Sequence, residues 1–565
     1  MSSPVPRFIN YPSPKESITD RKRSDAPPGN PVLSGILLAI LSRILAASTF
    51  IQRLLWRLNG FHKLKDLPEV EGYAARWDPT VIPIEKEPGE LLQLNEIPKP
   101  RRRKNEKSYY TTADYHERYL SGELTPIEVV EALLPLITRV KGQKPSKYSV
   151  AYLDVQPDLV RATARASTER YKAGKPLSPL DGVPVAVKDE VNLKGHSRSL
   201  GSRLDFADKL DRTDWCVRKW EEAGAVILGK TNMHELGLDT TNNNAVWGTP
   251  INPHNEGYYT GGSSGGSGCT AAQGIAPVVL GVDGGGSIRI PSAFCGLYGL
   301  KPTQSRVSTW PAEHVSSVAV CGPMCPNIDD LALAYRVMAQ PCPDDPVNGL
   351  FPPTLTTKVI NAEAVGRKYI GIDRDWVARS DPDVLEMFNA AVTHHISQGY
   401  EVVDIHIPLQ EENQKAFSLT ILAESMAAVK PDQLKLLQHP QQILLNVSGT
   451  HGTAQDLIAC ARLRDRAMRH LSWLFEKYPG MLILSPTMPM AGWKIRKPSD
   501  VTDGYSAADP DMALKSMEYT CFWNWCGTPA ITCPMGYSSA SLPAGIMVCL
   551  VTPLDFPFAN VLYRL

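Results

Sequence analysis

The sequence GVDGGGSIRIPS, from Gly281 to Ser292, follows a second segment of small residues, TGGSSGGSG, from Thr260 to Gly268. Residues this small permit positive φ angles and let the backbone come close to another group. A solvated linker has a similar composition, but the stretch between the two segments, residues 271–280, is largely apolar. We therefore expect both segments to be packed, with their backbone against a ligand or a reacting group.

The position of Ser287 directly after three glycines points to acyl transfer rather than to nucleotide binding. Neither segment contains the G-x-x-x-x-G-K-[ST] pattern of a phosphate-binding loop, and a dinucleotide fingerprint is matched by chance in such glycine-rich runs. Gly284, Gly285 and Gly286 instead bring successive unobstructed N–H groups to one hydroxyl. Such a turn can form an oxyanion hole, in which each donor contributes about 2.7–4 kcal/mol of transition-state stabilisation.

A serine nucleophile needs a base, and the nearby histidines do not supply an obvious one. His196, His234 and His254 stand in no triad signature, and Ser287 does not stand in a G-x-S-x-G elbow. Lys188 remains, at the end of the apolar segment GVPVAVKDE. Burial disfavours the ammonium form, so a lysine carried there can act as a neutral amine. The alternative is a surface lysine whose ammonium group stays in water.

Together these motifs resemble the amidase signature family. The resemblance rests on GVPVAVKD around Lys188, TGGSSGG around Ser263 and GVDGGGSIRIPSAFCGLYGLKPT around Ser287, separated by 75 and 24 residues. The segments AGAVILGKTNMHELG, NNNAVWGTPINPHN, MLILSPTMP and YTCFWNWCGTPAITCPMG agree with it, so it covers most of residues 110–555. The fold it implies is a single large α/β domain, a mixed β-sheet covered by helices.

The resemblance also implies roles for individual residues. Ser287 would be the nucleophile, Ser263 the bridging serine and Lys188 the base, so that protons pass from Ser287 through Ser263 to Lys188. A cis serine peptide bond in the Ser263–Ser264 region would aim the bridging hydroxyl. The backbone N–H groups expected to hold the oxyanion are those of Gly284, Gly285, Gly286 and Ser287. The product would be an acyl-enzyme that water cleaves, and no metal or organic cofactor is implied.

Within this family the chain resembles the plant fatty acid amide hydrolases, through TNMHELGLDTTNNN, YYTGGSSGGS and the long N-terminal extension. That likeness implies hydrolysis of lipid amides such as N-acylethanolamines, with N-terminal helices at a membrane surface. Less specialised amidases of the fungal type, acting on short or aromatic amides, share the same motifs. An amidotransferase subunit that releases ammonia from glutamine uses the same triad, but the apolar N-terminal extension argues against it.

Residues near the motifs are predicted to be structural. Asp283 and Arg289 are expected to form a buried ion pair that frames the loop, with Ser264 in a loop and Ser267 at a helix start. Packing roles are expected for Ser292, Cys269 and Cys295. The chain departs from the family at Ser541, where glycine is common. It also reaches Leu565 soon after the last predicted strand, which implies a very short closing helix or a truncated gene model.

Outside the motifs, the chain is divided into four regions. Residues 1–30, rich in proline and serine, are predicted to be a disordered tail, and 31–60 an apolar helix. Residues 61–108 are predicted to be a linker with a basic run, PKPRRRKNEK, that either is solvated or contacts anionic lipid. Residues 109–565 would form the amidase domain, with the signature region at 181–303.

The segment Val32–Trp56 carries only two charges, Arg43 and Arg53, and as one helix would be about 37 Å long. Its charge-free part is shorter than a membrane-spanning helix requires. Three interpretations stay open: a helix lying in a membrane interface, a spanning helix with snorkelling arginines, or a helix buried against the protein or a dimer partner.

Composition and periodicity complete the prediction. Hydrophobic residues make up 43% of the chain, and 59 basic residues balance 59 acidic ones, which excludes wholesale disorder and a strongly basic surface for nucleic acid. The odd count of eleven cysteines suggests free thiols in a reducing compartment, so we expect a cytoplasmic protein, either free or held at an intracellular membrane by residues 32–56. Predicted elements are strands at 183–187, 225–228, 369–372, 401–407, 481–484, 530–533 and 545–551, and helices from 125, at 215–223 and at 381–397.

Overall fold

The computed structural model describes residues 8–19, 29–84, 90–99, 109–312, 316–355 and 368–549. The basic run after Lys99 and the chain beyond Cys549 lie outside the described residues, so the predictions for them stay predictions. All eleven cysteines lie within the described ranges, and all are buried and free of disulfides.

A mixed sheet of eleven strands forms the centre of the molecule, in the order β11-β10-β12-β15-β14-β8-β9-β7-β5-β6-β4. The strands are β4 (Tyr152–Asp154), β5 (Pro184–Lys188), β6 (Val226–Thr231), β7 (Val278–Asp283), β8 (Tyr298–Lys301), β9 (Val320–Cys325), β10 (Tyr369–Ile372), β11 (Glu401–Asp404), β12 (Leu482–Pro486), β14 (Ala530–Tyr537) and β15 (Pro543–Cys549). Strand β5 pairs in parallel with β6 and β7, whereas β7 and β9 are antiparallel. The predicted mixed sheet is thus confirmed.

Every residue of β5, β6 and β7 is buried. Strands covered on both faces have near-continuous apolar sequences rather than alternating ones, which explains why the segment of β5 could be recognised as a strand. Strand β7 has the same character, but it was not predicted. The predicted strand at 401–407 is three residues shorter, because β11 ends at Asp404 where its pairing with β10 ends.

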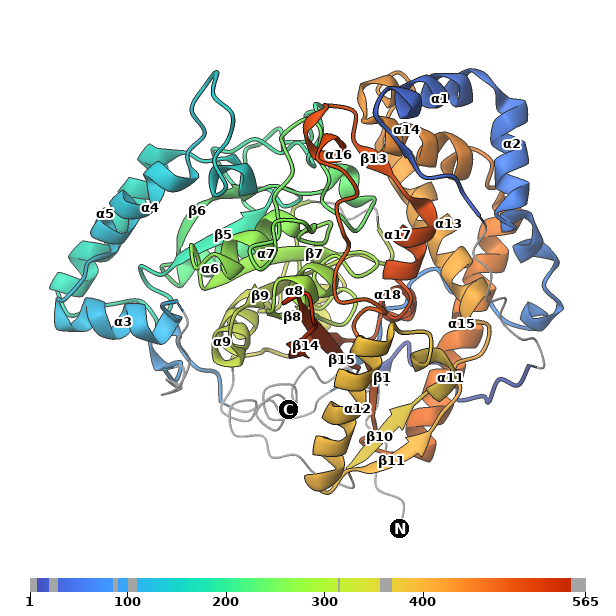
Figure 1. Ribbon diagram of the computed structural model, residues 1–565. Helices are drawn as coiled ribbons and strands as arrows, with labels where there is room; N and C mark the ends of the chain where they lie inside the picture. Colours follow the sequence, from blue (N-terminus) through green and yellow to red (C-terminus); the bar gives the residue numbers. More distant parts are fainter. Residues whose placement is uncertain are drawn as a thin grey trace, which may run out of the picture.

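Helices cover the sheet on both faces (Figure 1). The longer ones are α3 (Thr112–Ser121), α4 (Pro126–Ile137), α5 (Pro157–Lys172), α6 (Trp215–Glu222), α7 (Gly265–Ala272), α9 (Ile328–Met338), α12 (Pro382–Ser397), α13 (Gln410–Ala428) and α15 (Ala454–Lys477). The short helices used below are α8 (Arg289–Phe294), α14 (His439–Leu444), α17 (Pro510–Ser516) and α18 (Cys521–Trp525). Helix α4 starts at the predicted capping box, in which Thr125 and Glu128 each accept the other's backbone N–H.

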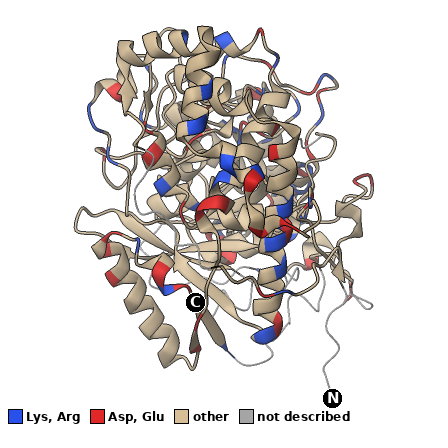
Figure 2. Ribbon diagram, turned by 90° about the vertical axis from the view of Figure 1, so that its right-hand side faces the viewer, with Lys and Arg blue, Asp and Glu red and all other residues tan. Residues whose placement is uncertain are grey.

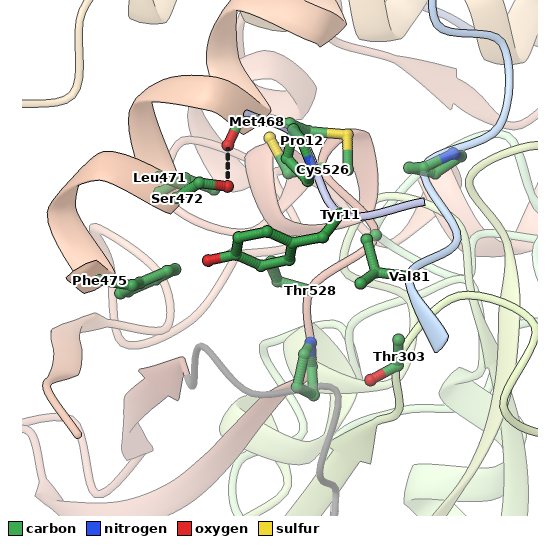
Figure 3. Close-up of a pocket in the computed structure, with 13 residues that line it drawn as sticks. Tyr11, Pro12, Val81, Thr303, Met468, Leu471, Ser472, Phe475, Cys526 and Thr528 are labelled. Atoms are coloured by element: carbon green, nitrogen blue, oxygen red, sulfur yellow. Dashed lines mark hydrogen bonds between the residues drawn. The ribbon is translucent and has the colours of Figure 1, made fainter. Parts of the chain in front are cut away.

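The predicted disordered tail is wrong for residues 8–19. Strand β1 (Phe8–Ile9) pairs with β3 (Ile82–Pro83), and the Ser17 N–H donates to His470 Nδ1 on α15 at 3.1 Å. Figure 3 shows Tyr11 and Pro12 in a pocket together with side chains of α15. Composition suggested disorder, but the few apolar side chains of the tail find a complementary surface on α15.

The predicted single helix over Val32–Trp56 is also wrong. The segment forms α1 (Gly35–Ala47) and α2 (Thr49–Leu58), bent by 105° between them. Ser48 has an extended backbone, and its hydroxyl accepts the Ile51 N–H at 3.4 Å, so it caps α2 instead of continuing α1. Among the described helices, none is by itself long and apolar enough to cross a membrane.

Helices α1 and α2 each bury one face and expose the other. Leu38 and Leu45 on α1 and Trp56 on α2 are buried, and Ser42 Oγ hydrogen-bonds His439 Nδ1 on α14 at 3.1 Å. The exposed apolar side chains of the two helices are Ile36, Leu37, Ile40, Ile44, Phe50, Leu54 and Leu58. Of the three interpretations, packing against the protein is therefore confirmed for one face only.

Candidate active site

Lys188 is the last residue of β5, which lies between β7 and β6, and its side chain is 1% exposed. Its Nζ donates to Ser263 Oγ at 2.8 Å and to the carbonyl oxygen of Val282, at the end of the neighbouring β7, at 3.1 Å. The adjacent ends of two parallel strands thus hold the amine against the serine. The prediction of a buried lysine, rather than a surface one, is confirmed.

Ser263 lies in the loop that leads into α7, and the Gly262–Ser263 peptide bond is cis. The cis bond therefore precedes Ser263, within the region where the resemblance placed one. The Ser263 carbonyl oxygen accepts the His234 N–H at 3.0 Å. The next residue, Ser264, donates its N–H to the Ser287 carbonyl oxygen at 3.2 Å, so the two small-residue segments are joined through their backbones.

Ser287 is held by a buried ion pair between Asp283 and Arg289, as predicted. Arg289 donates from Nε to Asp283 Oδ2 and from Nη2 to Asp283 Oδ1, both at 3.0 Å, and neither side chain is exposed. Burial alone would raise the pKa of Asp283, but the Arg289 guanidinium holds it well below its ordinary value. Asp283 also accepts the N–H groups of Gly286 and Ile288, so it shapes the whole turn around the serine.

The predicted set of four oxyanion donors needs one correction. The Gly286 N–H donates to Asp283 Oδ1 at 2.7 Å and is not available to a substrate. Within the described residues, the N–H groups of Gly284, Gly285 and Ser287 donate to no protein acceptor. These three groups can therefore hold an oxyanion. A free N–H in this loop could be identified only after the carboxylate of Asp283 had been placed.

Ser287 Oγ likewise makes no hydrogen bond with any described residue, and Ser287 is 6% exposed. The structure thus brings Lys188 and Ser263 into direct contact and holds Ser287 beside them through the Ser264–Ser287 backbone bond. In enzymes without bound substrate, catalytic hydrogen bonds are often long or poorly aligned, and they shorten when substrate binds. A serine whose hydroxyl is unpaired, in a turn with free N–H groups and next to the segment of a serine–lysine pair, can attack a carbonyl carbon.

Sequence reasoning missed Glu190, whose Oε2 lies 2.7 Å from Lys188 Nζ. Its side chain is 23% exposed, so it lies between the buried lysine and the solvent. Glu190 was visible in the sequence two positions after Lys188, but it lies in the turn that follows β5, so strand alternation could not predict that it contacts the lysine.

Two further buried groups, His234 and Glu235, follow β6 and were also missed as part of the site. Burial and the positive charge of Lys188 lower the pKa of His234 to about 3, so its ring is neutral. Burial raises the pKa of Glu235 to about 8, although its Oε2 accepts the Gln438 N–H at 2.6 Å. Gln441 Nε2 lies 2.8 Å from His234 Nε2, and this contact connects α14 to the site.

A cavity of about 230 Å³ opens beside Ser287. Gly285, Ser287 and Gly237 line its inner end, and most of the remaining lining is apolar. Apolar or aromatic lining residues are Leu55, Phe61, Phe417, Ile421, Leu422, Ile443, Leu444, Val447, Leu514 and Met517. They come from α2, α13, α14, α17 and nearby loops, which is why no single stretch of sequence predicted the cavity.

The other small residues of the motifs have structural roles, as predicted. Ser264 precedes α7, and its hydroxyl donates to the Val282 carbonyl oxygen at 3.2 Å. Ser267 lies in the first turn of α7 and donates to the Leu280 carbonyl oxygen at 2.9 Å. The predicted packing residues Ser292, Cys269 and Cys295 are all buried. Among the described residues, no cluster of three or more metal-ligating side chains occurs.

Comparisons with known proteins agree with this architecture. Residues 131–549 match the family model described as Amidase. The fatty acid amide hydrolase of Medicago truncatula is 32% identical over 461 residues, which cover 78% of this chain and 73% of that protein. A glutamyl-tRNA(Gln) amidotransferase subunit of Chloroflexus aggregans is 29% identical over 470 residues, covering 78% of this chain and 93% of that protein.

Among solved structures, a bacterial aryl acylamidase of the amidase signature family superposes with a TM-score of 0.67 at 25% identity, covering 80% of this chain and 94% of that chain. The mixed sheet covered by helices is therefore the amidase-signature fold. The chain belongs to the amidase signature family, and it is a hydrolase that acts on amides.

Proposed function

We propose that this amidase cleaves fatty acid amides, such as N-acylethanolamines, through a Ser263–Ser287–Lys188 relay and an acyl-enzyme. The observation that carries the proposal is the mostly apolar lining of the cavity that opens on Ser287. Burying an alkyl chain there contributes about 0.8 kcal/mol for each CH₂ group removed from water. A short amide would leave most of that lining without a partner.

The proposed reaction begins with neutral Lys188. Ser263 passes its hydroxyl proton to Lys188 Nζ and takes the proton of Ser287, whose Oγ then attacks the carbonyl carbon. The N–H groups of Gly284, Gly285 and Ser287 hold the oxyanion. When the tetrahedral species collapses, the C–N bond breaks and the amine takes the proton back from Lys188 through Ser263. Water attacks the acyl-enzyme by the same relay, which releases the fatty acid and restores Ser287.

Helices α1 and α2 support the further proposal that the enzyme docks on a membrane surface. Their exposed apolar residues include Phe50, which is 76% exposed, and Leu58, which is 67% exposed. Leu55 and the residue that follows α2, Asn59, line the cavity, so the same helix links the exposed face to the substrate site. In Figure 2, which views the right-hand side of Figure 1, positive and negative residues are interspersed, so the attraction would be chiefly apolar.

The reaction is tested by labelling with a fluorophosphonate, comparing wild type with Ser287→Ala, Ser263→Ala and Lys188→Ala. We expect stoichiometric labelling of wild type at Ser287 and none of Ser287→Ala. Retention of wild-type turnover by Ser287→Ala would overturn the mechanism.

The substrate is tested with long-chain acylethanolamides, aromatic amides, short amides and glutamine. We expect kcat/KM to rise with acyl length, and Ile443→Trp, which narrows the cavity, to reduce it for long chains more than for short ones. Ile396→Trp, at an exposed position on α12, is the matched control. A preference for short amides or glutamine would instead support a general amidase or an amidotransferase subunit.

Membrane docking is tested by sedimentation with neutral and anionic liposomes. Phe50→Ser with Leu58→Ser should reduce the bound fraction, whereas Leu210→Ser, equally exposed in a loop after β5, should not. If the Phe50→Ser, Leu58→Ser variant and the wild type bind liposomes equally, α1 and α2 have only a structural role. Docking at the cytoplasmic side of an intracellular membrane is part of the same proposal.

A further inference from the structure

We propose that Glu190 is a positioning residue that sets the charge of Lys188, and thereby the pH at which Ser287 becomes reactive. The inference rests on the proposed Ser263–Ser287–Lys188 reaction. It adds a group to which the motifs of the sequence assign no role.

The surroundings of Lys188 Nζ carry the argument. Three oxygen atoms lie within 3.1 Å of it: Ser263 Oγ at 2.8 Å, the Val282 carbonyl oxygen at 3.1 Å and Glu190 Oε2 at 2.7 Å. Nζ donates hydrogen bonds to the first two of these oxygens, and the third belongs to a carboxylate, whose negative charge favours the ammonium form. A base needs the lone pair of the neutral amine. The carboxylate of Glu190 is therefore placed where it opposes formation of that neutral amine.

Glu190 acts on Lys188 through charge rather than through a directed hydrogen bond. Its Oε2 is within ion-pair distance of Nζ, yet it makes no hydrogen bond. Oppositely charged groups this close favour each other's charged form, and the effect is large where one partner is shielded from water, as Lys188 is. A Cβ atom added at Gly237 would lie 3.9 Å from Glu190 Oε2, which places the carboxylate next to the inner end of the cavity.

The other ionisable groups around Lys188 are committed elsewhere or neutral. Asp189 Oδ1 pairs with Lys230 Nζ at 3.2 Å, and its Oδ2 accepts from Ser199. Asp283, at the end of the neighbouring β7, pairs with Arg289 as described above. On the segment after β6, His234 is neutral, and the raised pKa of Glu235, about 8, keeps that carboxyl largely protonated at neutral pH.

The consequence is a defined pH response. Before reaction, an N–H bond of the Lys188 ammonium breaks and the proton goes to solvent base, leaving the lone pair that accepts the Ser263 proton. Glu190 opposes this loss, so it shifts the rise of activity to higher pH. Replacing its charge should move that rise to lower pH. It should also lower the plateau rate, because the amine becomes a weaker base.

The experiment measures the second-order rate constant of fluorophosphonate labelling at Ser287 against pH, for wild type, Glu190→Gln, Glu190→Asp and Glu169→Gln. Labelling forms the Ser287 Oγ–P bond and expels fluoride, so it reports nucleophile activation without reference to the natural substrate. Glu169 pairs with Lys172 on the surface of α5. Glu169→Gln is therefore the control, because it also removes one carboxylate that is paired with a lysine.

In Glu190→Gln we expect the acid limb to move to lower pH by about one unit or more. Glu190→Asp, whose carboxylate is withdrawn by one methylene, should shift it less in the same direction, and Glu169→Gln should leave it unchanged. An acid limb at the wild-type pH in Glu190→Gln overturns the inference, and if that variant does not fold, an unmoved limb in Glu190→Asp does so. Absence of labelling at Ser287 in wild type would instead refute the proposed function.

Discussion

Replacing Asp283 by asparagine should destabilise the protein and disorder the turn around Ser287. The Asp283 carboxylate accepts both Arg289 side-chain donors at 3.0 Å, and neither side chain is exposed. Asparagine keeps the shape but presents an NH₂ group to the guanidinium, so one buried charge loses its partner. Breaking a buried ion pair on one side costs about 3–5 kcal/mol. The two charge-assisted hydrogen bonds from Arg289, at about 1.5–3 kcal/mol each, give a loss of stability of similar size.

The assay is equilibrium unfolding in urea followed by tryptophan fluorescence, combined with fluorophosphonate labelling under native conditions. We expect Asp283→Asn to lose about 3–5 kcal/mol of the free energy of unfolding and at least tenfold in labelling rate. The control is Asp404→Asn, because the Arg374–Asp404 pair is more than half exposed and should contribute about 1 kcal/mol or less. A loss below 1 kcal/mol with wild-type labelling in Asp283→Asn would refute the argument that this pair holds the loop.

Three more predictions concern particular backbone and charge positions. Ser541 has φ 59° in the turn between β14 and β15, so Ser541→Gly should raise the free energy of unfolding by up to about 1 kcal/mol, whereas Ser538→Gly should not, as thermal unfolding can show. Gly286 has φ 134°, and a Cβ there would lie 2.6 Å from Ile290 Cδ1 and from Thr520 Oγ1, so Gly286→Ala should abolish labelling and cost about 1–3 kcal/mol of stability. Gly284→Ala should cost less, because the closest atom to its Cβ would be the flexible end of Ile421, at 3.1 Å. Equal effects of the two substitutions would contradict this interpretation of the loop. Burial raises the pKa of Glu235 to about 8, so native Glu235 keeps a proton that the unfolded chain loses above about pH 4.5. Its contribution to stability is therefore present at low pH and is lost as the pH rises towards 8. Glu235→Gln should reduce this pH dependence of the free energy of unfolding, measured in urea at several pH values, and an unchanged pH dependence would exclude a raised pKa for Glu235.

Much of the candidate site was predictable because its chemistry restricts the residue types. The turn around Ser287 requires glycine where the backbone has positive φ, as at Gly286, and a buried strand such as β5 is a continuous apolar run that ends at Lys188. These restrictions act on neighbours in the chain and are therefore written in consecutive residues. The same holds for the α/β pattern and for the capping box at Thr125.

Tertiary structure alone decided which groups are paired and which are free. Lys188 meets Ser263, 75 residues further along the chain, and the Ser264 N–H reaches the Ser287 carbonyl oxygen, because segments that follow different strands converge at the strand ends. The cavity combines side chains of α2, α13, α14 and α17, and α1 contacts α14 through the Ser42–His439 hydrogen bond. Such outcomes depend on which faces of distant segments bury each other, and a local pattern cannot specify that choice. The sequence by itself therefore determined the family's fold and the residues able to react, whereas packing determined their charge environment and the space offered to a substrate.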